Sequence, residues 1–389
     1  MNNKVNNFLS AIGLIRRYKK IKNINELKFS GMLHILNKQD LRNLDLNQIY
    51  DRFSGKLANP FHGLTNKDDK TTVVGWTEDV LWPINDKMPK GFEPKKILDT
   101  SKKPQEMEQL HKSGINGSGI CIAIIDERLA KHPEYADNVK YYEQIGDYWG
   151  TSDGPDFHGS LVAGYMVGNE TGSAPGANLY YFAANSWGNQ EKGLEWGHGK
   201  NKIQALKRIL EINKTLSPQK KIRFVSGSWG TDGFSPQELK EFDTLAQECK
   251  SNGIMLIICH RDYAENAIPF DPRYGTKYDS NPKDNRIGVP TNGRTTPYYQ
   301  GGYVYLRAAG NSSIPPYLSG VYACALQGNE LFFTRPNWQD ELDKIMQETT
   351  TESPNGGKTI NPLSIRNAVT QRVREMEINL MKQKSIQHE

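Results

Sequence analysis

Three residues have the types and surroundings that acyl transfer requires: an acid, a base and an alcohol. Asp126 ends an apolar run, His158 opens a segment of small residues, and Ser312 precedes prolines that fit only a first helical turn. An aspartate orients a histidine, which takes the proton of a serine as its hydroxyl attacks a carbonyl. A helix N-terminus also favours developing negative charge. Taken alone, Asp126 is better explained as the cap of a strand end and His158 as a structural histidine, and Ser312 or Ser313 is also explained as a helix cap.

A parallel α/β domain is predicted to position them. Apolar runs typical of strands buried on both faces occupy residues 120–125, 179–184, 222–225 and 254–259. Helix-like segments lie at about 159–168, 201–214, 236–251, 313–327 and 363–384. The alternation indicates βαβ units, in which ligand and catalytic groups collect at the carboxyl ends of the strands. The segment from about Asp262 to Tyr303, rich in Asp, Asn, Pro, Gly and Tyr, is predicted to form long surface loops.

The first 95 residues differ in charge from the rest of the chain. Residues 1–60 hold eleven Lys or Arg and four Asp or Glu, so this part carries the excess behind the net charge of +5. We predict a basic N-terminal extension over 1–95, acting as a prosegment or a docking element, followed by the α/β domain over 96–389. The N-terminal extension contains a basic amphipathic stretch that suits a lipid or nucleic-acid surface. A solvated helix face explains this stretch better, and neither partner is predicted.

The order of acid, base and alcohol along the chain resembles the subtilases, the subtilisin-like serine peptidases of family S8. The similar stretches are residues 122–126, 132–134, 158–164, 172–180, 228–230 and 310–320. Together they span about residues 105 to 330. The resemblance implies a subtilisin-like three-layer α/β/α fold with a mostly parallel sheet, and a catalytic triad of Asp126, His158 and Ser312.

The resemblance also implies a substrate edge and an oxyanion hole. Ser228, Trp229 and Gly230 correspond to the strand edge that pairs with an extended peptide. Asp262 falls where an amide normally donates to the oxyanion, and an Asp donates only when protonated. His260 or Asn266 would take this role if the alignment shifts by a few residues. We therefore predict that Asp262→Asn keeps or raises activity.

The expected function is that of a cytoplasmic serine endopeptidase, a hydrolase acting on peptides or proteins. A subtilase fold that binds peptides without cleaving them is the alternative. No cofactor is predicted; calcium is common in the family, but residue spacing places no site. Neither nucleic acid nor stable membrane insertion is expected, and the oligomeric state is left open.

Composition and other motifs narrow the classes further. A chain of 389 residues with 37% hydrophobic and 24% charged residues is typical of globular proteins, and no apolar run reaches the length of a membrane span. The apolar stretch at 8–15 precedes its arginines, so no signal peptide is expected. Four widely spaced cysteines suggest buried thiols in a reducing compartment. No glycine-rich nucleotide motif occurs, and the Gly-x-Ser-x-Gly match at 150–154 lacks the apolar strand of an esterase.

Overall fold

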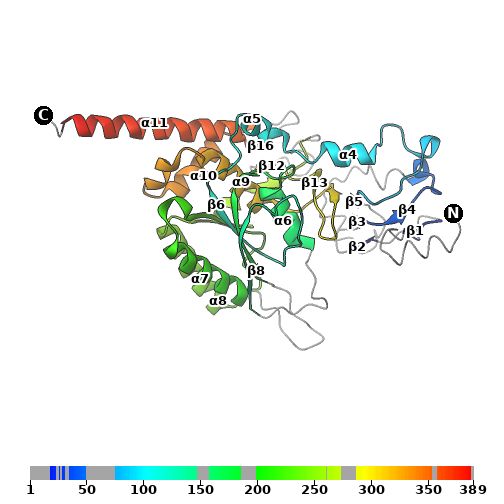
Figure 1. The fold of residues 1–389 in the computed structure, drawn as a ribbon, viewed down its shortest axis with the longest axis horizontal. Helices are drawn as coiled ribbons and strands as arrows, with labels where there is room; N and C mark the ends of the chain where they lie inside the picture. Colours follow the sequence, from blue (N-terminus) through cyan, green and yellow to red (C-terminus); the bar gives the residue numbers. More distant parts are fainter. Residues whose placement is uncertain are drawn as a thin grey trace.

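A five-stranded parallel sheet forms the centre of the computed structural model, which describes residues 18–22, 26, 29–30, 35–49, 75–146, 157–184, 199–259, 261–272, 286–352 and 357–386 (Figure 1). The strand order of this central sheet is β10 (Met255–Ile258), β9 (Ile222–Gly227), β6 (Cys121–Asp126), β8 (Asn178–Ala184) and β7 (Val139–Ile145). Every neighbouring pair in this sheet is parallel. The carboxyl ends of the strands therefore meet at one edge, where the predicted site residues lie.

Helices cover both faces of the sheet, as the alternation of apolar side chains on β6 requires. Cys121, Ala123 and Ile125 face the core beneath α7 (Lys200–Thr215) and α8 (Pro236–Ser251). Ile122 and Ile124 face the opposite core, with α6 (Phe157–Val167) and α9 (Ile314–Leu326). On that side α9 also contacts α11 (Pro362–Ile386), which packs against α10 (Trp338–Glu348) and extends well beyond the body (Figure 1). The predicted three-layer α/β/α class is confirmed.

Shorter elements connect these layers. The helical ones are α4 (Pro94–Thr100), α5 (Glu108–Lys112) and the 3-10 helices η2 (Leu46–Ile49), η3 (Asn85–Lys87), η4 (Gln105–Met107), η6 (Pro218–Lys220), η7 (Asp262–Ala264), η9 (Asn311–Ser313) and η10 (Glu330–Thr334). A four-stranded sheet has the order β11 (Ala267–Pro269), β12 (Ile287–Val289), β16 (Lys358–Thr359) and β15 (Thr351–Glu352). Among the helices of the described ranges, none has the length and apolar character needed to cross a bilayer.

The prediction of uninterrupted loops from Asp262 to Tyr303 is wrong for the described part of that segment. It contains β11, β12 and β13 (Arg294–Pro297), and β13 pairs with β14 (Tyr303–Leu306) in an antiparallel hairpin. Polar composition hid β13, because Arg294, Thr295 and Thr296 are all buried and hydrogen-bonded to neighbouring carbonyl groups. Residues 273–285 lie outside the described ranges.

The described part of the N-terminal extension joins this hairpin through its backbone. A second five-stranded sheet has the order β13, β14, β5 (Gly75–Thr77), β3 (Ile35–Leu36) and β2 (Phe29–Ser30), while β1 (Lys19–Lys20) pairs with β4 (Gln39–Asp40). On β5, Trp76 is 2% exposed and packs its ring against Tyr305 of β14. Strands on both sides of the predicted boundary near residue 95 thus share one sheet.

Candidate active site

The structure brings the predicted acid and base together. Asp126 ends β6 and His158 is the second residue of α6; the Nδ1–H group of His158 donates to Oδ1 of Asp126 at 2.7 Å. The same oxygen accepts the backbone N–H of Glu127 at 2.8 Å. The side chain of Asp126 is only 2% exposed, whereas that of His158 is 29% exposed. The carboxylate is therefore held from two sides while the imidazole retains an open side.

Electrostatics at this pair favour the protonated imidazole. Burial lowers the pKa of His158, but the charge of Asp126, its hydrogen bond and the nearby Glu127 outweigh that effect and raise the pKa to about 9. A carboxylate close to a histidine stabilises the positive ring because opposite charges attract strongly away from water. The pair is thus built to stabilise the imidazolium that forms when the histidine takes a proton.

A glycine lets the helix that carries His158 approach the end of β6. A Cβ atom on Gly159 would lie 2.7 Å from the carbonyl oxygen of Glu127 and 2.5 Å from the hydroxyl of Tyr181. Any larger residue would push the first turn of α6 away from Asp126. The small residue after the histidine therefore has a steric reason in this fold.

Ser312 lies in the turn that leads into α9, and this turn is fixed by its neighbours. Gly310 enters it with a φ of 71°, which favours glycine. Next to Ser312, the hydroxyl of Ser313 bonds to Oγ1 of Thr291 and to the carbonyl of Gly310, both at 2.7 Å. The Ser228 hydroxyl donates to the backbone carbonyl of Ser312 at 2.6 Å. The backbone around Ser312 is thus tied to the end of β9 and to the segment after β12.

The Ser312 hydroxyl itself is less firmly held. Its Oγ donates to the backbone carbonyl of Ser228 at 3.4 Å, a long hydrogen bond. Helix α6 packs against η9, so this turn adjoins the helix that begins with His158. Within the described ranges, the contacts of Ser312 do not include a hydrogen bond to the His158 ring. The structure thus places all three predicted residues at one edge and joins two of them directly.

The predicted substrate segment follows β9 at the same edge. The indole N–H of Trp229 donates to the carbonyl of Ile125 at 3.0 Å, and its own carbonyl accepts the N–H of Cys259 at 3.1 Å. The backbone of Gly230, one residue further, has no hydrogen-bond partner in the part of the chain that is described.

The predicted oxyanion role of Asp262 finds no support in its contacts. Asp262 begins η7 with a φ of 48°, and its side chain is 52% exposed. The carboxylate pairs with Nε of Arg261 at 3.3 Å, and the same guanidinium also binds Asp243 of α8. A carboxylate in an ion pair accepts hydrogen bonds and does not donate them. His260 lies outside the described residues, and Asn266 uses its backbone carbonyl to accept the N–H of Ile287.

Two further residues of this region were not identified as site residues from the sequence. Lys202 is buried within the apolar pattern of α7, where a lysine was a detectable anomaly. Cys259 follows β10 directly, and its Sγ lies 3.4 Å from the carbonyl oxygen of Asn311. Burial raises the pKa of the Cys259 thiol to about 12, so it stays protonated and is a poor nucleophile.

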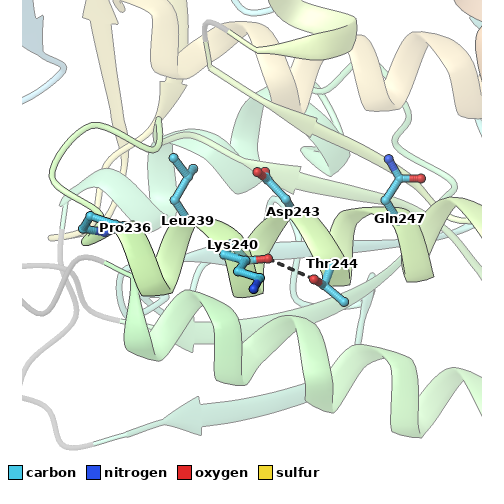
Figure 2. Close-up of a pocket in the computed structure, with 6 residues that line it drawn as sticks. All are labelled: Pro236, Leu239, Lys240, Asp243, Thr244 and Gln247. Atoms are coloured by element: carbon cyan, nitrogen blue, oxygen red, sulfur yellow. Dashed lines mark hydrogen bonds between the residues drawn. The ribbon is translucent and has the colours of Figure 1, made fainter.

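A surface hollow and the distribution of possible metal ligands are two further features of the described ranges. A shallow hollow of about 460 Å³ follows the outer face of α8 (Figure 2). It is lined by Pro236, Leu239, Lys240, Asp243, Thr244 and Gln247. Over the same ranges, no three His, Cys, Asp or Glu side chains are grouped to hold a metal ion.

Comparison with known proteins gives one family match and several distant structures. The family model described as "Subtilase family" matches residues 117–331. The prenylagaramide maturation protease PagA is 17% identical, with a TM-score of 0.48 over 68% of this chain and 98% of its own. Fervidolysin from Fervidobacterium pennivorans is 16% identical, with a TM-score of 0.48 over 67% of this chain and 44% of its own. The PatG macrocyclase domain is 13% identical, with a TM-score of 0.48 over 68% of this chain and 95% of its own. No curated protein sequence matches.

Proposed function

This chain belongs to the subtilase family, and from that premise we propose that it is a serine endopeptidase using Asp126, His158 and Ser312. The observation that carries the proposal is the 2.7 Å hydrogen bond between His158 and Asp126, at the sheet edge where the Ser312 turn packs against α6. Family membership supports a peptidase fold, and the paired acid and base supply the proton transfer that peptide hydrolysis requires.

The proposed reaction has two halves. Rotation of the Ser312 side chain turns its hydroxyl from the Ser228 carbonyl to His158, which takes the proton as Oγ bonds to the substrate carbonyl carbon. His158 then gives this proton to the leaving amine as the C–N bond breaks, leaving an acyl-enzyme. Water repeats the sequence and releases the acid, with His158 as the base. Asp126 keeps the ring oriented and stabilises its positive charge throughout.

Stabilisation of the oxyanion is assigned to the Ser312 backbone. Within the described ranges the N–H of Ser312 donates to no backbone carbonyl, whereas that of Ser313 bonds to Gly310. The Ser312 N–H group lies at the start of the helical segment that continues as α9, where free N–H groups favour negative charge. This donor is available even though the Asp262 carboxylate is paired with Arg261.

The substrate in this proposal is an extended peptide or protein segment that pairs with Gly230, as a strand adds to a sheet edge. A cytoplasmic location is part of the proposal and is supported by the cysteines. Cys121, Cys249, Cys259 and Cys324 are all buried and unpaired. Thiols in this state suit a reducing compartment.

Reaction with a fluorophosphonate probe tests the proposal. The purified chain should form a covalent adduct at Ser312 between pH 7 and 9, and Ser312→Ala should remove it. Ser118→Ala changes an exposed serine near the opposite end of β6 and should label like the wild type. Absence of labelling in a folded wild-type chain would refute catalysis and favour the alternative, a subtilase fold that binds peptides without cleaving them.

A further inference from the structure

Lys202 is a charged residue in an apolar setting. Lys202 lies in the first turn of α7, on the buried face that also carries Ile203 and Leu206. Only 3% of its surface is exposed. Its Nζ lies 4.7 Å from the ring centre of Trp229 and 5.7 Å from that of Phe234. An ammonium group over aromatic faces gains a cation–π attraction, but this replaces only part of the lost hydration.

The ammonium group also lacks a carboxylate partner among the described residues. Two other lysines of α7 differ: Lys207 pairs with Glu241 at 2.5 Å and Lys214 pairs with Glu248 at 3.6 Å, both near the surface. Burial lowers the pKa of Lys202 to about 8, although the charge of Asp126 acts in the opposite direction. A buried cation that is left unpaired is costly, and such groups concentrate at functional sites.

The position of Lys202 connects it to the substrate segment. Trp229, whose ring it contacts, is the middle residue of the segment Ser228–Gly230, and its indole bonds to the carbonyl of Ile125, one residue before Asp126. A peptide that pairs with Gly230, as proposed above, would lie next to the residue whose ring contacts the ammonium group. A carboxylate on that peptide would supply the ion-pair partner that Lys202 lacks among the described residues.

We propose that Lys202 is a specificity-determining residue that selects peptides with an Asp or Glu side chain close to the scissile bond. The inference rests on the proposed function, because it concerns which substrates the Ser312 site accepts. An ion pair shielded from water and formed only with acidic substrates would favour them by about tenfold or more over their amide counterparts.

Digestion of a mixed peptide library, read by mass spectrometry, tests this inference. Wild type should cleave peptides with Asp or Glu at one fixed distance from the cut about tenfold more efficiently than Asn or Gln versions. Lys202→Met, which keeps the length and apolar stem of the side chain, should remove this ratio. Lys202→Glu should favour Lys or Arg at the same position. Lys207→Met removes an exposed lysine of the same helix and should keep the wild-type ratio.

The outcomes separate this inference from the proposed function. If the fluorophosphonate labels Ser312 and peptides are cleaved without an acidic preference, the role of Lys202 is refuted and the peptidase proposal stands. An acidic preference that persists in a folded Lys202→Met variant refutes the role as well. If the folded wild type neither reacts with the probe nor cleaves peptides, the proposed function fails, and this inference fails with it.

Discussion

The acid–base pair and the nucleophile turn meet at one edge of the sheet but are built differently. Asp126 and His158 share a short hydrogen bond, and the buried carboxylate also accepts a backbone N–H. Ser312 has a firmly anchored backbone, yet its hydroxyl makes only a long bond to the Ser228 carbonyl. The acid–base pair is therefore already assembled, whereas the proposed mechanism requires the hydroxyl to turn from the Ser228 carbonyl to His158.

The largest effect is expected from removing the charge that organises the pair. Asp126→Asn should lower kcat about 10⁴-fold, because the imidazole then loses its orientation and the partner of its positive form. The same variant should lower the pKa of His158, measured from the imidazole resonances in NMR spectra. A loss of less than tenfold in a folded variant would show that the acid–base pair is not the organising half of the site.

A strong pH dependence is the next expectation. Since the pKa of His158 is raised to about 9, only about 1% of the rings are neutral at pH 7 and about half at pH 9. Therefore kcat/KM should rise about 50-fold over this range, measured with a peptide that does not itself titrate there. A profile that is already flat at pH 7 would contradict the electrostatics described for the pair.

The same pKa shift has a consequence for stability. The folded chain holds the His158 proton more tightly than the unfolded chain, whose histidines titrate near pH 6.5. The pair therefore stabilises the fold fully below about pH 6.5, and this contribution is lost as the pH rises through 9. Thermal melts of wild type and Asp126→Asn should differ more at pH 6 than at pH 10. Equal differences at both pH values would argue against the raised pKa.

A smaller effect is expected on the nucleophile side. Ser228→Ala removes the hydroxyl that donates to the Ser312 carbonyl, worth about 0.5–1.5 kcal/mol, and should slow acylation about two- to tenfold. The fluorophosphonate labelling rate measures this step directly. Thr244→Ala is the matched control, because its hydroxyl also donates to a backbone carbonyl, at 2.9 Å, but on the exposed face of α8. A loss as large as that of Asp126→Asn would mean that the turn depends on this bond entirely.

The smallest effect concerns Asp262. Asp262→Asn should keep activity or raise it a few-fold, because a carboxylate paired with Arg261 contributes no donor to an oxyanion and an amide can donate. Steady-state kinetics of the purified variant check this. A loss of tenfold or more would indicate that the carboxylate itself takes part in the reaction.

The sequence predicted the parts of this fold that depend on apolar periodicity. The sequences of strands such as β6 and β10 are unbroken apolar runs because both faces of each strand are buried. The end of the run in β6 indicated Asp126 as a candidate site residue. By contrast, β7 alternates exposed and half-buried residues at the edge of the sheet, and β13 buries Arg294 and Thr295. Polar strands of this kind depend on tertiary hydrogen bonds, which composition does not report. The pairing of β5 with β14 joins residues more than 200 positions apart and has no local signal.

For the site, the sequence supplied the residues but not their contacts. The chain order of Asp126, His158 and Ser312 predicted that they meet, and the structure places them at one edge. Neither the ion pair that Asp262 forms with Arg261 nor the contact between Lys202 and the Trp229 ring was predictable, because both depend on side chains brought together by the fold.

Trapping the acyl-enzyme is the most direct test of the central claim. Acid quenching during turnover of an activated peptide ester, followed by intact-mass and fragment analysis, should show one acyl group on the peptide that contains Ser312. Ser312→Ala should show none. Release of the leaving group without a covalent adduct, or an adduct on a different residue, would contradict the account.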